Sequence, residues 1–523
     1  MAFEILDCTL RDGGYYTSWD FDDALVQTYL YEVAKLPINT LEVGYCNHPA
    51  AGYRGEWCYL GKERLAWARE ILRPDQELGI MLDAKDCTPE RLPELLGHLV
   101  GTVDIVRMAV APKEFAHGVS LARALKQLGF KVGFNTMYLS TYSEDLREFR
   151  PLLEGYDVID VLAVVDSYGG CVPTQVARQI TAVREMFPGK PIGFHGHDNT
   201  CLAFANSLAA LEAGAFGLDA TFVGMGRGAG NTRTEMLLVE KARSGVEVDF
   251  DAVASIVQQF ETLRDTFKWG SNLAYMLSGA ANLPQKDVMD WLGKSRYSPV
   301  SVVRALKNQS NALLDDQAFP ALSTGGLPGE GGDTVLIIGG GGSVTRHIDA
   351  IRRFARAGGV CVVHANTQHL DLVGTFGGRE LVCLPGHAAV HLPDSADGGA
   401  VAGFVVPKPP RFHGTVPTSL KSPVFQAAPY PPSEGGGLGP VSDIGPLALA
   451  FGAARAVSAR KIFLVGFDGY AHASVAQQEL ATEIQATINR MRAEPDVSVA
   501  SLTPTLYDVA TRSIYAEAQA LEV

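Results

Sequence analysis

Two histidines, His195 and His197, are separated by one residue in the sequence FHGHDN, directly after a short apolar run. Because residues i and i+2 of a β-strand point to the same face, both imidazoles can reach one point. Paired imidazoles at the end of a strand are typical of a metal site that stays open on one side. The alternative is two histidines packed in a polar turn, and the choice depends on the other polar residues of the chain.

A carboxylate and a cation occur side by side near the N-terminus, in the sequence LRDGG at residues 10–14. Asp12, His195 and His197 together offer one carboxylate and two imidazoles, a ligand set that suits a divalent ion. We expect Mn or Mg, with Co and Zn as alternatives. Asn231, in the sequence GMGRGAGN, adds an amide oxygen as a further ligand.

An open metal site of this composition favours a chelating substrate, and a 2-oxo acid presents a carboxylate and a ketone oxygen side by side. A divalent metal acts as a Lewis acid that stabilises the enolate formed when a C–C bond is made or broken. Arg11 adjoins Asp12, so we expect its guanidinium to stabilise the same oxyanion. Glu42 and Asp166 are candidates for orienting water or substrate. The expected reaction partners are small molecules, a 2-oxo acid and an aldehyde.

The elements that position these residues follow from an alternation of short apolar runs and amphipathic segments over residues 3–245. Strands are predicted at 4–10, 40–43, 78–82, 104–109, 132–136, 158–165, 192–197 and 218–222. Helices are predicted between them, at 22–36, 62–72, 89–99, 119–128, 144–153, 174–186 and 201–213. Strict alternation of eight strands favours a (β/α)8 TIM barrel over an open doubly wound sheet, with the chemistry at the carboxyl ends of the strands.

The rest of the chain differs in kind from the barrel. Beyond a barrel domain at 1–285, we predict a helical extension at 286–320, a Gly- and Pro-rich linker at 321–333 and a second domain at 334–523. The fold class is thus α/β, with an N-terminal TIM barrel followed by a C-terminal Rossmann-like domain. Within the second domain, the long Pro- and Gly-rich stretch 392–441 is predicted to be a lid or binding loop.

The second domain opens on TVLIIGGGGSV, a buried strand that leads into a glycine loop and a helix predicted at 345–357. Such a loop lets a phosphate approach backbone amides at a helix N-terminus. It is a poor dinucleotide fingerprint, since Val344 stands where the third small residue belongs and no acidic residue ends the next strand. A tight strand–helix turn without a ligand is the alternative.

Composition excludes several classes of function. A net charge of −14 argues against nonspecific binding to nucleic acid or to an anionic membrane. We see no apolar run long enough to span a bilayer and no signal peptide, and the eight cysteines are scattered without a CxxC pair. These features predict a cytoplasmic protein with reduced thiols. The helical segment 250–320 is expected to cover the barrel mouth or to make a subunit contact in a homo-oligomer.

Five motifs in order resemble the DRE-TIM metallolyase superfamily, which includes 4-hydroxy-2-oxovalerate aldolase, hydroxymethylglutaryl-CoA lyase and isopropylmalate synthase. They are LDCTLRDGG, LEVGY, VVDSYGG, FHGHDN and GMGRGAGN, and the resemblance covers about residues 1–285. It implies metal ligation by Asp12, His195 and His197, with Asn231 as a further ligand. It also implies that Arg11 stabilises the enolate and that Glu42 and Asp166 occupy positions that are catalytic in the lyase branch.

Two positions depart from that family. The hydroxyoxovalerate aldolases have a catalytic histidine three residues after the metal aspartate, where this chain has Tyr15. Hydroxymethylglutaryl-CoA lyase has a catalytic cysteine in the loop before the final GN, and here Phe222 occupies that place. Tyr15 or Tyr16 is therefore either a substitute acid–base residue or a packing residue.

The second domain resembles a domain of unknown function found in bacterial surface-glycan proteins, related to motility-associated and sialic acid transferases. The resemblance rests on IIGGGGS and on the segment 442–470. It implies binding of a nucleotide or nucleotide-sugar near Gly341, Ser343 and Asp468.

The sequence therefore predicts a metal-dependent aldolase or lyase that acts through a 2-oxo acid enolate, on a sugar or nucleotide-linked aldehyde. Two alternatives stay open. One is a condensing synthase of the same superfamily that uses an acyl-CoA. The other is a glycan-assembly transferase with its chemistry in the C-terminal domain.

Overall fold

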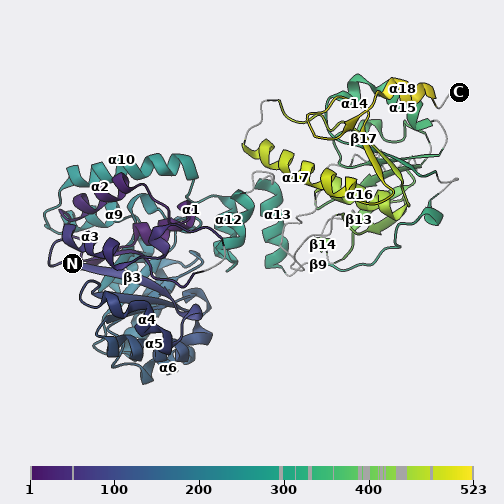
Figure 1. Ribbon diagram of the computed structural model, residues 1–523. Helices are drawn as coiled ribbons and strands as arrows, with labels where there is room; N and C mark the ends of the chain where they lie inside the picture. The colour runs from purple at the N-terminus through teal and green to yellow at the C-terminus, as the bar shows by residue number, and fades with distance from the viewer. Residues whose placement is uncertain are drawn as a thin grey trace. The chain divides into compact units, whose positions relative to one another are not determined.

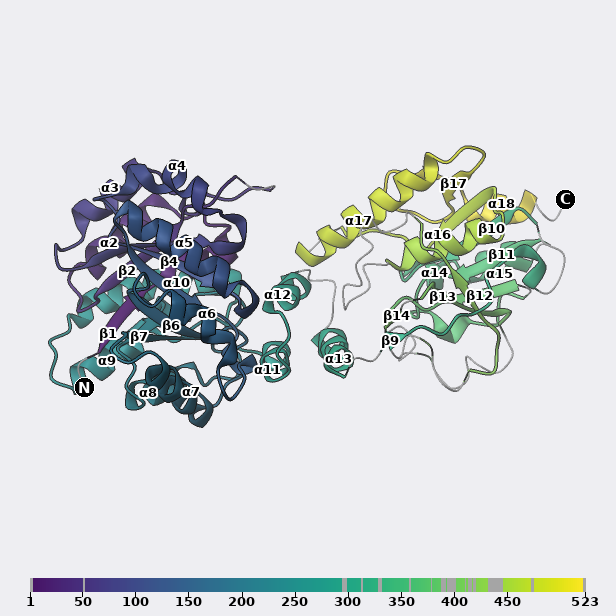
Figure 2. The same cartoon turned by 90° about the horizontal axis from the view of Figure 1, so that it is seen from below.

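The computed structural model describes residues 3–49, 52–293, 299–311, 314–327, 332–356, 359–377, 379–386, 392, 401–409, 411–412, 416, 420–430, 445–471 and 475–520. The chain divides into two compact units, Met1–Met289 and Asp290–Val523. Figure 1 and Figure 2 show them as a helix-wrapped barrel and a layered sheet, and each is described by itself.

The first unit is a closed barrel of eight parallel strands in the order β1 to β8, so the predicted TIM barrel is confirmed. The strands are β1 (Glu4–Asp7), β2 (Thr40–Tyr45), β3 (Glu77–Asp83), β4 (Ile105–Val110), β5 (Lys131–Thr136), β6 (Val161–Asp166), β7 (Ile192–Gly196) and β8 (Gly217–Ala220). Their residues are mostly apolar and buried, because the helices cover the outer face and side chains fill the interior.

Helices surround this barrel and follow its strands (Figure 1). They are α1 (Thr9–Thr17), α2 (Asp23–Val33), α3 (Lys62–Ile71), α4 (Leu92–Leu96), α5 (Phe115–Leu128), α6 (Arg150–Glu154), α7 (Pro173–Met186), α8 (Ala203–Glu212) and α9 (Thr234–Arg243). Further along the chain come α10 (Phe250–Phe267) and α11 (Leu273–Ala280), then α12 (Gln285–Gly293), which crosses the boundary between the units, and α13 (Pro299–Ser310), which belongs to the second unit. The start of α12 packs on the carboxyl-end loops, since Gln285 Nε2 donates to Ser167 O at 3.1 Å and to Asn199 Oδ1 at 2.8 Å.

The first strand is shorter than predicted. β1 ends at Asp7, and α1 begins at Thr9, whose amide donates to Asp7 Oδ1 at 3.0 Å. LRDGG was predicted at the end of a strand, yet Gly13 and Gly14 are helical. Their missing Cβ allows a close neighbour, since a Cβ on Gly14 would lie 2.1 Å from Trp19 Cδ1. Arg11 and Asp12 therefore project from the start of a helix and not from a strand end.

The second unit contains a parallel eight-stranded sheet in the order β15-β13-β12-β11-β10-β16-β17-β18, which agrees with the predicted α/β class. Its strands are β10 (Thr334–Ile338), β11 (Val360–His364), β12 (Arg379–Cys383), β13 (Gly403–Pro407), β15 (Val424–Ala427), β16 (Lys461–Val465), β17 (Ser498–Ser501) and β18 (Ala510–Thr511). A separate antiparallel pair joins β9 (Leu314–Asp315) to β14 (Arg411–Phe412).

Helices cover both faces of this sheet because successive strand residues point to opposite sides. Val335 and Ile337 pack in one apolar cluster, and Leu336 and Ile338 pack in another. The first cluster includes residues of α16 (Pro446–Ala456) and α17 (Val475–Arg492). The second includes residues of α14 (Ser343–Arg346), α15 (Ile348–Arg356) and α18 (Ile514–Ala520).

Two expectations for this unit need correction. The stretch 392–441, predicted to be a lid or binding loop, supplies the sheet strands β13 and β15, whose short apolar runs were hidden by the surrounding Gly and Pro. Several other residues of that stretch lie outside the described part. The helix predicted at 345–357 is divided into α14 and α15. Within the segment 321–333, Leu322 and Leu327 are buried in the apolar cluster of the second unit.

The remaining sequence expectations concern thiols and membranes. All eight cysteines are unpaired thiols, and only Cys201 is exposed. Among the described helices, none combines the length and the apolar character that crossing a membrane requires.

Candidate active site

Asp12, His195 and His197 meet at the carboxyl end of the barrel. All three side chains are buried, and one ligand atom from each lies within 4.8 Å of the others. The Nε2 atoms of both histidines lie 3.9 Å from Asp12 Oδ2. Atoms that share an ion at about 2.1 Å each are separated by roughly 3–4 Å, so the spacing fits one cation between them.

The other ring nitrogen of each histidine is held in place. His195 Nδ1 lies 3.1 Å from Asp219 Oδ2, and His197 Nδ1 lies 3.0 Å from the carbonyl oxygen of Asp166. Such contacts fix each ring orientation and favour the tautomer with a free Nε2 lone pair. His197 Nε2 is buried and has no hydrogen-bond partner within the described part of the chain, as expected of an atom that binds a metal ion.

Protonation states also suit metal binding. Burial, together with the nearby His195, lowers the pKa of His197 to about 3, which leaves a neutral imidazole at neutral pH. Burial alone would raise the pKa of Asp12, but Arg11 and the two histidines hold it well below its usual range. An ionised carboxylate beside neutral imidazole is the state in which these groups bind a cation.

Asn231 completes this group of oxygen and nitrogen donors. Its Nδ2 donates to Asp12 Oδ2, and its Oδ1 is buried with no hydrogen-bond partner in the part of the chain that the structure describes. The residue forms an isolated bridge with His197, so the loop after β8 lies against the end of β7. Two orphaned buried atoms, His197 Nε2 and Asn231 Oδ1, thus belong to the same site, and the residues present fit a divalent cation.

A buried network of charges supports this site from inside the barrel. Arg11 bonds to Asp12 Oδ1 through Nη1 and to Glu42 Oε1 through Nε, both at 2.6 Å. Arg107 lies 3.2 Å from Glu42 Oε2 and 2.5 Å from Asp219 Oδ2. Since Asp219 also contacts His195, the network leads from one metal-site residue to another.

The sequence reasoning missed Arg107 and Asp219. They are only 3% and 5% exposed, within the apolar strands β4 and β8. A charge inside an otherwise apolar parallel strand was the available signal, because such a charge must be paired. Three carboxylates and two guanidinium groups leave one negative charge in the network. A divalent cation would make the centre singly positive and so suited to an anionic ligand.

A cavity of about 370 Å³ lies over these groups and is lined by Arg11, Asp12, His195 and His197. Tyr15 also lines it and is 37% exposed at its mouth. Tyr16 points elsewhere, because its hydroxyl donates to Gly228 O at 2.6 Å. Of the two tyrosines considered from the sequence, Tyr15 is therefore the one that faces the cavity.

The two carboxylates that were predicted to be catalytic, Glu42 and Asp166, bind to other groups of the protein. Glu42 is buried between Arg11 and Arg107 and does not line the cavity. Asp166 accepts from the amides of Gly169 at 3.0 Å and Cys171 at 3.1 Å, which holds the loop after β6. Burial raises the pKa of Asp166, against the effect of these amides. The geometry favours a supporting position for both, and their catalytic roles stay predictions.

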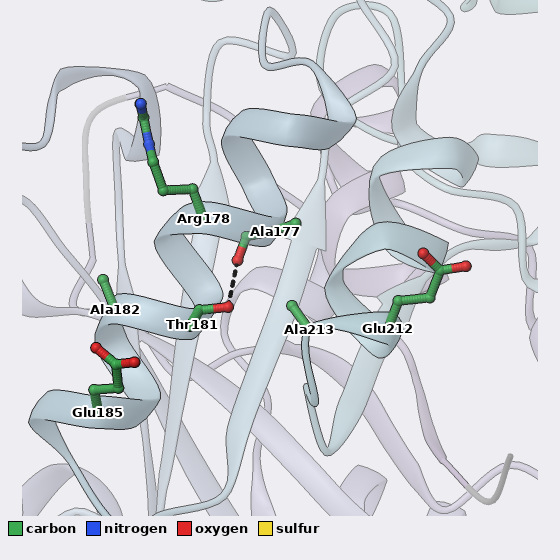
Figure 3. A pocket seen from close by; sticks show the side chains of 7 residues that line it. All are labelled: Ala177, Arg178, Thr181, Ala182, Glu185, Glu212 and Ala213. Carbon is green, nitrogen blue, oxygen red and sulfur yellow. Dashed lines mark hydrogen bonds between the residues drawn. The ribbon is translucent and has the colours of Figure 1, made fainter.

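A second hollow of the first unit lies on its outer surface between α7 and α8. Figure 3 shows the long side chains of Arg178, Glu185 and Glu212 pointing in different directions there. Thr181 Oγ1 donates to the backbone oxygen of Ala177 at 2.9 Å within the same helix. Because its charged groups do not converge, this groove lacks the features of a reaction site, unlike the cavity above the histidines.

The residues predicted to bind a nucleotide do meet in the second unit. Asp468 Oδ2 accepts from the amide of Ser343 at 2.9 Å, and Asp468 Oδ1 accepts from the Ser343 hydroxyl. A Cβ on Gly341 would lie 2.6 Å from the Asp468 carboxyl carbon. The carboxylate thus occupies the place beside the glycine loop that a phosphate would take, so nucleotide binding stays a prediction without support from this geometry.

The support given to His195 yields a prediction for Asp219→Asn. The substitution keeps the side-chain size but removes the charge that orients the imidazole, so we expect the affinity for Mn to fall about 10–100-fold. Competition titration of the purified chain with a metal indicator measures this, and circular dichroism checks that the barrel is folded. Asp265→Asn, on the exposed side of α10, is the control, and an unchanged Mn affinity in Asp219→Asn would contradict the supporting role.

Comparison with known proteins agrees with this architecture. Residues 109–259 match the HMGL-like family model. The chain is 30% identical over 262 residues to 4-hydroxy-2-oxovalerate aldolase from Geobacillus genomosp. 3, covering 48% of this chain and 73% of the relative. It is 28% identical over 252 residues to oxaloacetate decarboxylase from Mycobacterium tuberculosis, with the same coverage of 48% and 73%.

A solved structure covers the same part of the molecule. It is the N-terminal domain of a Bacteroides vulgatus protein provisionally described as an aldolase, with 43% sequence identity and a TM-score of 0.54. The match covers 58% of this chain and 100% of that one. Taken with the family model and the curated relatives, it confirms the resemblance seen in the motifs: the chain belongs to the HMGL-like family of DRE-TIM metallolyases and is a carbon–carbon lyase.

Proposed function

We propose that the first unit is a divalent-metal-dependent aldolase that makes or breaks a C–C bond through the enolate of a 2-oxo acid such as pyruvate. The observation that carries the proposal is the buried group Asp12, His195 and His197, whose ligand atoms lie within 4.8 Å of one another, beside the guanidinium of Arg11. Mn and Mg are the metals that we propose.

The curated relatives support this choice of chemistry. 4-Hydroxy-2-oxovalerate and oxaloacetate, the compounds in the relatives' names, are both 2-oxo acids. Retro-aldol cleavage of the first and decarboxylation of the second each leave the electron pair of the broken bond on the carbon beside the ketone. The ketone delocalises this charge, and the product is an enolate. A site that stabilises this enolate therefore serves both reactions.

The metal ion and the residues around the cavity have different roles in the proposed reaction. A divalent cation supplies the Lewis acidity that favours the enolate. Arg11 lines the cavity, and its bonds to Asp12 and Glu42 fix its guanidinium before substrate arrives. Because the guanidinium is fixed and buried, it can stabilise a developing oxyanion without reorganisation at the moment of reaction.

Proton transfer is assigned to Tyr15. Its ring lines the cavity, and its exposure at the mouth lets it exchange protons with solvent. The family's acid–base residue at this position is a histidine, so a tyrosine hydroxyl would take over that role. The edge of Trp19, with ring centroids 4.8 Å away, holds the Tyr15 ring in place.

The central test needs no knowledge of the aldehyde. In D2O with Mn or Mg, the full chain is expected to exchange the methyl hydrogens of pyruvate for deuterium, and a chelator such as EDTA is expected to stop the exchange. Proton NMR follows the methyl signal, and mass spectrometry of pyruvate incubated with an aldehyde panel then identifies the partner. Absence of exchange with Mn, Mg, Co and Zn would contradict the proposal.

The finer alternatives stay predictions. A thiol-release assay with acyl-CoA substrates separates an acyl-CoA-dependent synthase from an aldolase. Isothermal titration of the full chain with CMP, UDP and GDP tests the predicted nucleotide or nucleotide-sugar site at Gly341, Ser343 and Asp468. The predicted homo-oligomer and cytoplasmic location are untested.

A further inference from the structure

Arg227 differs from the other two arginines of the active site. Arg11 and Arg107 are each paired with two carboxylates, which satisfies their charge. Arg227 lines the same cavity, yet it forms no ion pair with any residue that the structure describes. Its Nε is buried and has no hydrogen-bond partner among the described residues. A fixed cation at a cavity wall without a counter-ion is a site for an anion supplied from outside.

The loop after β8 fixes the position of Arg227. Gly226 packs so closely that a Cβ would lie 2.3 Å from Asn231 Nδ2, and Gly228 has φ +68, which other residues rarely adopt. The carbonyl of Gly228 accepts the Tyr16 hydroxyl at 2.6 Å. The Arg227 guanidinium carbon lies 5.5 Å from the centroid of the Tyr15 ring, so the charge is held beside the cavity mouth.

The groups around Arg227 do not neutralise its positive charge by an ion pair. The groups that act most strongly on its charge are Tyr15, Asp12, Tyr45 and Tyr138, and Asp12 is the carboxylate among these four. Asp12 is already bonded to Arg11 and Asn231. Asp83 also lines the cavity and interacts electrostatically with Arg227, but the two described side chains lie too far apart to form an ion pair. Burial raises the pKa of the Tyr45 hydroxyl well above its usual range, so this group stays neutral.

The net charge of the metal site indicates which of the two reactants Arg227 binds. With a divalent cation the buried network carries one positive charge, and the single carboxylate of a 2-oxo acid such as pyruvate neutralises it. Arg227 then adds a positive charge that the 2-oxo acid does not balance. The second reactant, which must approach through the cavity mouth, is the molecule left to supply a negative group.

We propose that Arg227 binds an acidic group, a carboxylate or a phosphate, on the aldehyde that reacts with the 2-oxo acid enolate. This inference rests on the proposed function and deepens it, because it names the substrate class as anionic aldehydes. A guanidinium suits the role, since its planar donors bind carboxylate or phosphate oxygens in pairs. A cavity of about 370 Å³ limits the aldehyde to a small molecule.

The experiment compares aldehydes matched in length and different in charge, with the full chain, saturating pyruvate and Mn. One pair is succinic semialdehyde and butyraldehyde, and the other is glyceraldehyde 3-phosphate and glyceraldehyde. The wild-type chain is expected to prefer the acidic member of at least one pair, and the preferred pair distinguishes a carboxylate from a phosphate.

Arg227→Gln is expected to raise KM for the preferred acidic aldehyde by roughly 100-fold or more, with a far smaller change for its neutral counterpart. Arg227→Lys, which keeps the charge and loses the paired donors, is expected to recover part of the loss. Arg178→Gln is the control, because Arg178 lies in the outer groove between α7 and α8 (Figure 3). Its KM values should equal those of the wild type.

Two outcomes overturn the inference and leave the proposed function intact. One is a wild-type chain that exchanges pyruvate hydrogens but has no preference within either pair. The other is an Arg227→Gln variant whose main defect is a higher KM for pyruvate in the exchange reaction without aldehyde. A wild-type chain that fails to exchange pyruvate hydrogens contradicts the proposed function itself.

Discussion

His195→Ala is expected to abolish metal-dependent exchange of deuterium into the methyl group of pyruvate. The substitution removes one of three buried donors that lie within 4.8 Å of one another, and it leaves Asp219 without its imidazole partner. Metal Lewis acidity is worth several kcal/mol at a transition state, so we expect the rate to fall about 1000-fold or more. Proton NMR of pyruvate in D2O measures the exchange.

Two controls keep this result interpretable. His98→Ala removes an exposed histidine of the same unit and should leave the exchange rate unchanged. Circular dichroism and a Mn titration of His195→Ala separate loss of metal from loss of fold. A folded His195→Ala variant that still exchanges pyruvate hydrogens at the wild-type rate would refute the metal assignment.

Arg11→Lys is expected to lower kcat for the same exchange by about 100–1000-fold while most of the Mn affinity remains. Lysine keeps the positive charge between Asp12 and Glu42, but it cannot bond to both and also donate into the cavity. The expected loss is that of one preorganised oxyanion donor. Initial rates over a range of pyruvate and Mn concentrations separate kcat from metal binding.

The choice of lysine matters because Arg11 is buried. Arg11→Ala would leave Asp12 and Glu42 facing each other without a cation, and breaking a buried pair costs about 3–5 kcal/mol of stability. Loss of activity in that variant would therefore include loss of fold. Arg243→Lys, on the exposed side of α9, is the matched control. A wild-type kcat in Arg11→Lys would contradict the role in enolate stabilisation.

Sequence periodicity was sufficient for the barrel and for the meeting of its ligand residues. His195 and His197 are two residues apart around the end of β7, and strand geometry puts residues at that spacing on one side. Closure of eight parallel strands then brings the start of the chain next to β8, since β1 pairs with β8. Asp12 and Asn231 come together for that reason, although 219 positions separate them.

The sequence did not predict the contacts between residues of different strands. Glu42, Arg107 and Asp219 belong to β2, β4 and β8, and nothing local to each strand indicates which partner it has. Likewise, LRDGG was predicted at the end of a strand, but it lies in α1, where Gly13 and Gly14 leave room for Met225 and Trp19. In the second unit, the glycine loop after β10 predicted a site for a phosphate. The structure shows that the Asp468 carboxylate accepts from the Ser343 amide beside this loop.

The residue types and their strand spacing alone thus determined that this chain has a TIM barrel and an Asp–His–His group suited to a cation. Only the tertiary structure decided which charges are paired, because pairing depends on side chains that barrel closure brings together across the interior. The same closure places Arg227 at the cavity wall, where it forms no ion pair with any carboxylate of the described residues.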